Sequence, residues 1–249
     1  MNEPIEILTQ NYVTGDCTIA TTNDPYSSKA YLYDQIPSTQ FIGTAGTDVI
    51  TVTFKNWQGS DLSISFDRII LLNTNFKDIT ADYWNGSEWI SIPEATATIA
   101  SGTTNKIIEI VTAITCTKMR VTVTDTNPTA QQRKLGELKV CKSIVSPAAL
   151  TTFARVDDQK AGAYRLAGGP IVAWREYTKV GGTLSLENVT NADLVLLLPY
   201  LKSATLITVI FYATFDVSEI YEFVIVNSPN YTIDRKAERY SINMELKER

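Results

Sequence analysis

The stretch from Phe66 to Ile92 constrains the fold more than any other part of the sequence. It opens with an apolar run, Ile69 to Leu72, that is too short for an independent helix and is typical of a strand buried on both faces. It closes on two aromatic segments separated by Asn85-Gly86-Ser87-Glu88. Asn-Gly between hydrophobic residues is a strong hairpin signal, because a tight primed turn needs residues that tolerate positive φ. The sequence therefore predicts a hairpin with Trp84 and Trp89 on its two strands.

The rest of the first half has the same β character. Ile50, Val52 and Phe54 alternate with threonines, which predicts a strand with one buried face. Met119 and Val121 alternate in the same way with lysine, arginine and threonine. Such segments are separated by turns every few residues, and no convincing helix precedes residue 150. This pattern predicts an antiparallel β-sandwich of the jelly-roll type.

The last hundred residues contain the one good helix pattern. Leu194, Leu197, Leu198 and Leu201 fall at helical spacing, with Asn191 as the expected cap and Asp193 in the first turn. Pro199 lies inside the pattern and is expected to kink or shorten the helix. Alternating segments on either side of the helix predict antiparallel strands. We therefore expect a small α+β domain, split-barrel-like, with one helix packed on a sheet.

These patterns divide the chain into three parts. Residues 1–28 are polar and are expected to form an N-terminal arm leading into a first strand. Residues 29–145 are expected to form the β-sandwich, and residues 150–249 the α+β domain. The segment from Ser143 to Thr152 carries a proline between small residues and is expected to be the linker.

Composition excludes several classes of function. The chain has no histidine, which removes Ser-His and Cys-His nucleophile pairs and the usual zinc ligand sets. The net charge of −5, with basic residues scattered, argues against nucleic acid as a partner. The sequence has no apolar run long enough to span a membrane and no secretory signal at its start. Cys17, Cys116 and Cys141 are odd in number and far apart, and Cys116 and Cys141, in strand-like segments, are expected to be small buried hydrophobic residues.

Several motifs of the first half resemble a known fold family. They are A-x-L-x-D-x-x-x-S-T-x-F from Ala30 to Phe41, an I-x-V-x-F strand, IILL-N-x-N before the aromatic hairpin, and K-L-G-E-L-K-V from Lys134. This order is similar to the discoidin or galactose-binding-like sandwich, particularly the versions carried by bacteriophage tail and baseplate proteins. The second half is similar in order and length to the ring domains of phage tails. The resemblance implies a structural component of a phage tail.

The same resemblance implies a candidate metal site. In carbohydrate-binding relatives, the segment that matches Asp34 to Thr39 and the acid that matches Glu137 enclose a structural calcium ion. Calcium takes six to eight oxygen ligands, which carboxylates and backbone carbonyls can supply. Alternatively, Asp34 caps a turn and Thr39 bonds the backbone locally. Asp34, Thr39 and Glu137 are the calcium candidates.

Four aromatic residues are candidates for contact with a ligand or partner. Trp57 lies in a predicted turn, Asn56 to Gly59, and is the best candidate for an exposed contact. Tyr83, Trp84 and Trp89 could form a platform that stacks on a sugar, or they could pair across the hairpin and cover the core.

Three functions remain open. The first is a structural, non-enzymatic tail component, made in the host cytoplasm and present in the virion, that contacts other tail proteins and copies of itself in a ring. The second is a carbohydrate-binding module for adsorption to a host-surface glycan. The third is a carboxylate-dependent glycoside hydrolase, although the sequence contains no catalytic motif.

Overall fold

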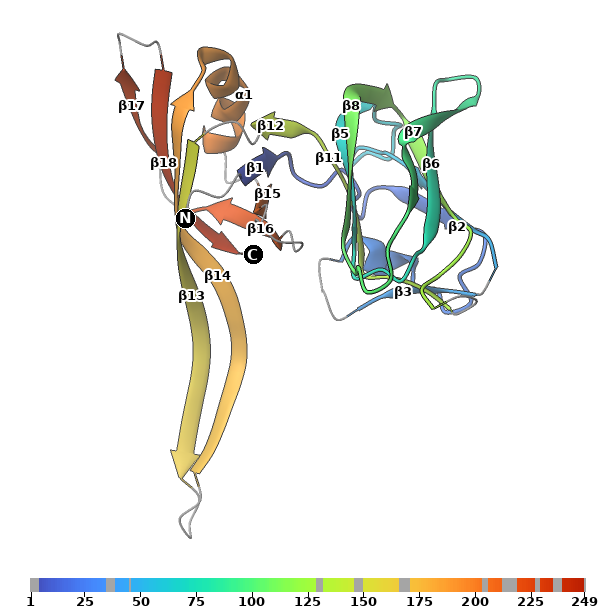
Figure 1. The fold of residues 1–249 in the computed structure, drawn as a ribbon, viewed down its shortest axis with the longest axis horizontal. Coiled ribbons are helices and arrows are strands. Elements are labelled where there is room, and N and C mark those ends of the chain that lie inside the picture. The colour runs from blue at the N-terminus through green and yellow to red at the C-terminus, as the bar shows by residue number, and fades with distance from the viewer. Residues whose placement is uncertain are drawn as a thin grey trace. The chain divides into compact units, whose positions relative to one another are not determined.

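The structure is a computed structural model that divides into two units. It describes residues 5–34, 39–44, 46–128, 132–145, 150–165, 171–202, 206–211, 219–226, 229–234 and 239–248. Unit 2 comprises Asn11–Lys142, and unit 1 comprises Met1–Gln10 together with Ser143–Arg249. The chain is mainly β, with antiparallel sheets in both units and a single α-helix in the part that is described (Figure 1).

Unit 2 is an antiparallel β-sandwich, as the sequence predicts. Its first sheet has the order β2 (Thr18–Thr21), β4 (Asp48–Thr53), β9 (Lys118–Val123), β6 (Asp78–Trp84) and β7 (Trp89–Thr98). Its second sheet has the order β11 (Glu137–Cys141), β5 (Ile64–Leu72) and β8 (Lys106–Cys116). A short pair, β10 (Arg133–Leu135) and β3 (Phe41–Gly43), and the 3₁₀ turn η1 (Lys29–Leu32) complete the unit.

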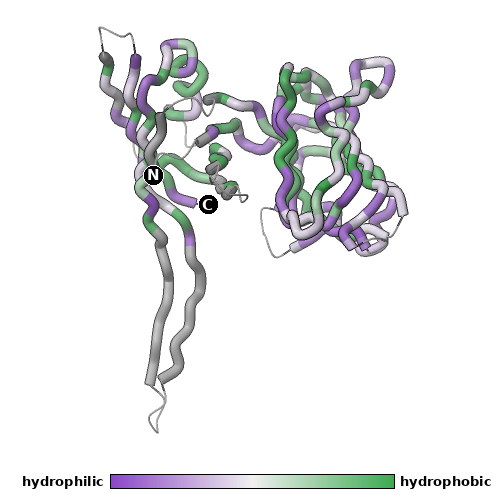
Figure 2. Tube along the Cα trace, viewed as in Figure 1, coloured by the Kyte–Doolittle hydropathy of each residue, from purple (hydrophilic) through white to green (hydrophobic). Residues whose placement is uncertain are grey.

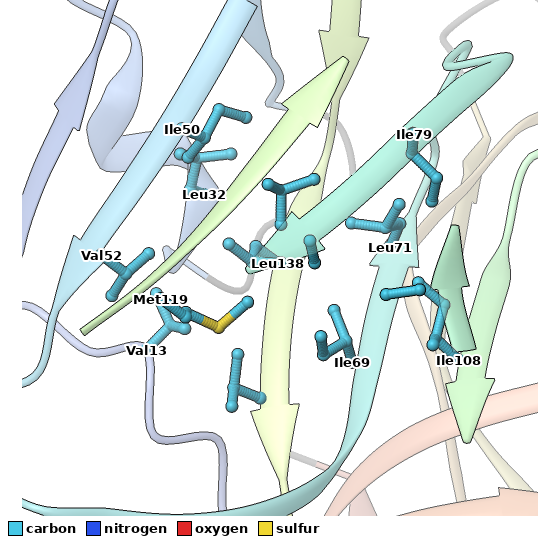
Figure 3. Packing of buried hydrophobic residues seen from close by; sticks show 14 of the residues in the cluster. Val13, Leu32, Ile50, Val52, Ile69, Leu71, Ile79, Ile108, Met119 and Leu138 are labelled. Atoms are coloured by element: carbon cyan, nitrogen blue, oxygen red, sulfur yellow. The ribbon is translucent and has the colours of Figure 1, made fainter. Parts of the chain in front are cut away.

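The core of unit 2 lies between its two sheets. Strand β4 alternates buried and half-buried residues, and hydrophobic and hydrophilic positions alternate along the strands of this unit (Figure 2). Ile50 and Met119 from the first sheet and Ile69 and Leu138 from the second belong to one hydrophobic cluster (Figure 3). The strands therefore form because their period-two pattern places one apolar face on each side of a shared core.

Unit 1 is one large sheet with a helix. The strand order is β12 (Ser143–Val145), β1 (Ile5–Leu8), β15 (Leu206–Phe211), β16 (Glu219–Ile225), β18 (Arg239–Glu248), β14 (Ile171–Val189) and β13 (Leu150–Arg165), with β17 (Asn230–Asp234) also paired to β18. Helix α1 (Asn191–Lys202) contacts β12 and β18. Leu194, Leu197 and Leu201 are buried with residues of the sheet in a second hydrophobic cluster.

The observed division of the chain differs from the division expected from the sequence. Residues 5–8 were expected in an arm before the sandwich, and they instead form β1, which pairs with both β12 and β15. Ser143–Val145 was expected at the start of a linker and forms β12. The sandwich is thus an insertion between two neighbouring strands of unit 1. Strand β1 is far from its partners in sequence, so no local pattern reveals these pairings.

The helix cap is one residue earlier than expected. The backbone N–H of Asp193 donates to Thr190 Oγ1 at 3.1 Å, and Thr190 Oγ1 donates to Asp193 Oδ2 at 2.6 Å. Thr190 is therefore the capping residue, and Asn191 as the cap was wrong, because the threonine and the aspartate satisfy each other across the first turn. The helix continues through Pro199 to Lys202.

The hairpin of β13 and β14 projects past the rest of unit 1 (Figure 1). Strand β13 pairs with β14 over its whole length, from Leu150↔Glu187 to Arg165↔Ile171. Strand β18 pairs with β14 only from Gly181 onward. Among the described strand pairings, Ile171–Val180 has β13 as its one neighbour, so this part of the hairpin is a two-stranded ribbon. Gly181-Gly182, a dipeptide that by itself is typical of a turn, lies inside the continuous strand β14.

Candidate functional site

A rigid turn between β4 and β5 presents Trp57 to solvent. The side-chain oxygen of Asn56 accepts hydrogen bonds from the backbone N–H groups of Gln58 and Ser60, each at 3.0 Å. Lys55 Nζ donates to the carbonyl of Gly59 at 3.0 Å and lies 3.0 Å from Asp61 Oδ1. Trp57 is 80% exposed. The exposed indole predicted from the sequence is therefore held on a preorganised turn.

The aromatic hairpin forms as predicted from its Asn-Gly signal. Asn85 Oδ1 accepts the N–H groups of Ser87 and Glu88, both at 2.9 Å, and Gly86 has φ +108°. Strands β6 and β7 are in register at Trp84 and Trp89. Their ring centroids lie 5.5 Å apart with an interplanar angle of 65°, an edge-to-face contact. The two tryptophans thus support each other on one face of the hairpin.

Two cations from β9 lie over these indoles. Arg120 Cζ is 4.6 Å from the ring centroid of Trp89, and Lys118 Nζ is 6.0 Å from that of Trp84. Arg120 Nε also donates to Asp82 Oδ2 at 2.8 Å. Cation–π contacts of this kind contribute about 0.5–1 kcal/mol each at exposed sites. The sequence does not single out these two residues, because the register between β9 and β6 depends on both strands and cannot be predicted from either one alone.

Tyr83 lies on the other side of the sheet. It packs partly against the hydrophobic core of unit 2, as expected for the residue before Trp84 in a strand. The structure therefore brings Trp84 and Trp89 together on the outer face and separates Tyr83 from them.

The Trp57 turn and the hairpin occur at the same end of the first sheet. Thr53, the last residue of β4, is the register partner of Lys118, the first residue of β9. Strand β6 ends at Trp84 beside β9, and the chain leaves β4 for the Trp57 turn just past Thr53. This end of unit 2, comprising Trp57, Trp84, Trp89, Lys118 and Arg120, is hereafter called the tryptophan end.

The three calcium candidates make protein contacts in the structure. Thr39 Oγ1 donates to Asp34 Oδ2 at 2.6 Å. Glu137 Oε1 lies 2.9 Å from Lys139 Nζ, an ammonium group that balances its charge. Among the described residues, no three His, Cys, Asp or Glu side chains group as a metal site would require. Residues 35–38 lie outside the described part of the chain, so the calcium site stays a prediction.

Two buried residues of opposite charge, Asp48 and Arg133, lie at the opposite end of unit 2. Asp48 is fully buried and accepts a hydrogen bond from Thr22 Oγ1 at 2.6 Å. Arg133 is 1% exposed and donates to the carbonyl of Thr44. Burial lowers the pKa of Arg133, while the negative charges of Asp48 and Asp125 raise it. Asp48 Oδ2 and Arg133 Nε form no hydrogen bond among the described residues, so each buried charge is compensated mainly by the electrostatic attraction of the other, a structural role that no sequence motif signals.

The three cysteines are free thiols. Cys116 and Cys141 are buried as predicted, whereas Cys17 is half-buried and its Sγ donates to the carbonyl of Tyr12 at 3.2 Å. Burial raises the pKa of the Cys116 thiol from 9.0 to about 11, against a smaller lowering by a backbone hydrogen bond from Lys118.

This shift predicts a loss of stability at alkaline pH. Between pH 9 and 11 the unfolded chain releases the Cys116 proton and the folded chain keeps it, so the free energy of unfolding falls as pH rises. Urea denaturation of the wild type and of Cys116→Val at pH 8 and pH 10 measures the effect. The wild type should lose more stability than the variant over this interval. Equal losses would contradict the assignment.

Comparisons with known proteins give likenesses of fold at low identity. No family model matches the sequence, and no curated protein matches it. A putative alpha-L-fucosidase from Bacteroides thetaiotaomicron is similar in structure, with 22% identity and a TM-score of 0.45, covering 55% of this chain and 29% of that one. The family 32 carbohydrate-binding module of NanJ from Clostridium perfringens, solved with galactose, has 13% identity and a TM-score of 0.45, covering 55% of this chain and 99% of the module.

A chitosan-binding module of a chitosanase/glucanase from Paenibacillus sp. IK-5 is also similar, with 18% identity and a TM-score of 0.42, covering 52% of this chain and 97% of the module. Likenesses of this level do not define a function. The described part of the chain also contains no helix with the length and hydropathy needed to cross a bilayer.

Proposed function

We propose that this protein is a non-catalytic binding protein whose sandwich recognises a glycan through its tryptophan end. The observation that carries the proposal is Trp57, 80% exposed on a turn whose conformation is fixed by side-chain hydrogen bonds. The apolar face of a pyranose ring is a good partner for an aromatic face, and Trp57 offers such a face to solvent. The fixed turn lowers the conformational entropy that binding would otherwise cost.

A glycan array followed by calorimetry on the best ligand tests this proposal. Trp57→Ala should weaken binding about 10-fold or more, because it removes the stacking surface. Its thermal stability should match the wild type, because the indole is not part of the core. Val111→Ala is the matched control, since Val111 is 89% exposed on β8 and its loss should leave affinity unchanged. Equal affinity of wild type and Trp57→Ala would refute the role of this residue.

A second candidate function is assembly into a phage tail, and the projecting ribbon of β13 and β14 favours it. A two-stranded ribbon is marginally stable in water by itself, so a partner that adds a strand or a packing face would stabilise it. The outward face of α1 also exposes an apolar stripe, Ala192, Val195, Leu196 and Pro199, at helical spacing. A second copy could cover both surfaces, and a heterologous contact that repeats would close a ring.

In this second proposal the protein is a structural component of the distal tail, baseplate or tail-tip region, made in the host cytoplasm and present in the virion. Light scattering over a concentration series, with negative-stain images, tests it. Closed rings, or ring formation with other tail proteins, would support it. A protein that stays monomeric alone and with such partners would exclude it and leave glycan binding as the function.

A further inference from the structure

The outer face of the first sheet of unit 2 carries a cationic cluster next to its tryptophans. Met119 and Val121 point into the core, so Lys118 and Arg120 on the same strand point outward. By the same alternation Ala81 is buried and Asp82 and Trp84 face outward. Register then sets Arg120 beside Asp82, and Asp82 beside Ser91. Beside the tryptophans this face thus carries two basic residues and one acidic residue, Asp82, and a second acidic residue, Asp78, lies further along β6.

The charges of this cluster are not balanced. Arg120 uses its Nε for Asp82 and its flat face for Trp89, and no hydrogen bond joins its terminal amino groups to a described residue. Lys118 Nζ lies over Trp84, and no carboxylate of the described residues lies within 4.0 Å of it. Glu88, at the hairpin tip, forms no ion pair with either cation. Within this cluster Lys118 is therefore the cation that has no carboxylate partner among the described residues.

The side chains are also held in place. The indole of Trp89 lies against both Trp84 and the guanidinium of Arg120, at 5.5 Å and 4.6 Å between centres. The carboxylate of Asp82 accepts a hydrogen bond from Arg120 Nε and so holds the guanidinium from a second direction. The side chain of Asp82 is 17% exposed. The terminal amino groups of a guanidinium in a fixed plane present a fork that fits a carboxylate with two parallel hydrogen bonds. The nearby ammonium of Lys118 supplies a second positive charge.

We propose that the tryptophan end selects acidic glycans, namely chains of sugars that carry a carboxylate, such as uronic acids. This inference rests on the proposed glycan-binding function and names its ligand class. A uronic acid has the two features that this end matches: an apolar ring face for the exposed indole of Trp57, and a carboxylate for Lys118 and Arg120. A neutral sugar would use the indole alone and leave Lys118 without a counter-charge and the terminal amino groups of Arg120 without an acceptor.

Oligogalacturonate and its methyl ester form a matched pair of probes, because esterification removes the charge and keeps the sugar ring. Calorimetry should show the acid bound about 3- to 10-fold more tightly than the ester at low salt. Lys118→Gln should remove most of that difference and leave the affinity for the ester unchanged. Lys134→Gln is the control variant, because it removes the same charge from an exposed residue of β10. Raising the salt concentration should weaken binding of the acid alone.

The outcomes separate this inference from the function on which it rests. Equal affinity for the acid and the ester would overturn the acidic-glycan assignment and leave glycan binding intact. Binding of neither this pair nor any glycan of an array would remove both. Equally tight binding of a single-stranded oligonucleotide, a polyanion without a uronic acid, would also overturn the assignment, because charge alone would then suffice. Trp57→Ala should weaken both probes, whereas Lys118→Gln should weaken the acid only.

Discussion

Replacing Gly182 by alanine is expected to destabilise unit 1 by about 3–5 kcal/mol, a large fraction of the stability of an ordinary folded unit. Gly182 has φ +149°, a conformation that residues with a Cβ rarely adopt. A Cβ at this position would lie 2.1 Å from the carbonyl oxygen of Ala154. That oxygen belongs to the neighbouring strand β13, which cannot move away without breaking its pairing to β14. Circular dichroism during urea denaturation measures the loss.

Gly102→Ala is the control for this prediction. Gly102 has φ +87°, and no atom lies within 4 Å of the Cβ position, so only the backbone conformation is penalised. Its cost should be about 1 kcal/mol. Unit 2 should keep its own transition in Gly182→Ala, and three of the four tryptophans, Trp57, Trp84 and Trp89, report on it by fluorescence. An unchanged unit 1 in this variant would show that β14 relaxes freely at this point.

Local sequence patterns predicted those parts of the fold that depend on interactions between residues close together in the sequence. The Asn85-Gly86 turn depends on side-chain and backbone bonds within four residues, and it forms as expected. The alternation of Ile50 and Val52 with threonines places both in the core because the period of a strand is two. Helix α1 was likewise predicted from leucines three and four residues apart, of which Leu194, Leu197 and Leu201 are buried and Leu198 is half-buried.

Features that depend on distant partners were not predicted. Strand β1 is four residues of unremarkable sequence, and only its pairing with β12 and β15 makes it part of unit 1. The insertion of the sandwich follows from that pairing. Gly181-Gly182 has the composition of a turn. In the structure these glycines instead allow the backbone of β14 to approach the backbones of β13 and β18 closely. A glycine pair in sequence cannot distinguish these two uses.

The tryptophan end was predicted in part for the same reason. The turn motif around Trp57 predicted its exposure, and the Asn-Gly hairpin motif predicted that Trp84 and Trp89 lie on neighbouring strands. In the sequence, Lys118 and Arg120 have the pattern of the polar face of an ordinary strand. Their contacts with the tryptophans arise only because β9 lies next to β6. Residues that act together across strands become visible only when the register is known.

The second large effect concerns two buried residues of opposite charge, Asp48 and Arg133. Asp48→Asn is expected to destabilise unit 2 by about 3–5 kcal/mol, the usual cost of leaving a buried charge without its partner. The asparagine side chain can still accept the hydrogen bond from Thr22, so the substitution removes the charge and little else. Arg133 stays protonated at neutral pH and is 1% exposed. The substitution therefore removes the negative charge of Asp48 that offsets the positive charge of the buried guanidinium. Urea denaturation with fluorescence detection gives the loss.

A double variant and a surface control separate charge from packing. Asp48→Asn with Arg133→Met should recover much of the lost stability, because an apolar side chain of similar length removes the unpaired charge. Asp61→Asn removes an exposed partner of Lys55, 52% accessible at its side chain, and should cost under about 1 kcal/mol. If the double variant were as unstable as Asp48→Asn, the loss would come from the hydrogen bonds of Asp48 and not from the charge it balances. Because the pair is buried, added salt should leave the cost of Asp48→Asn unchanged, whereas it should reduce the smaller cost of Asp61→Asn.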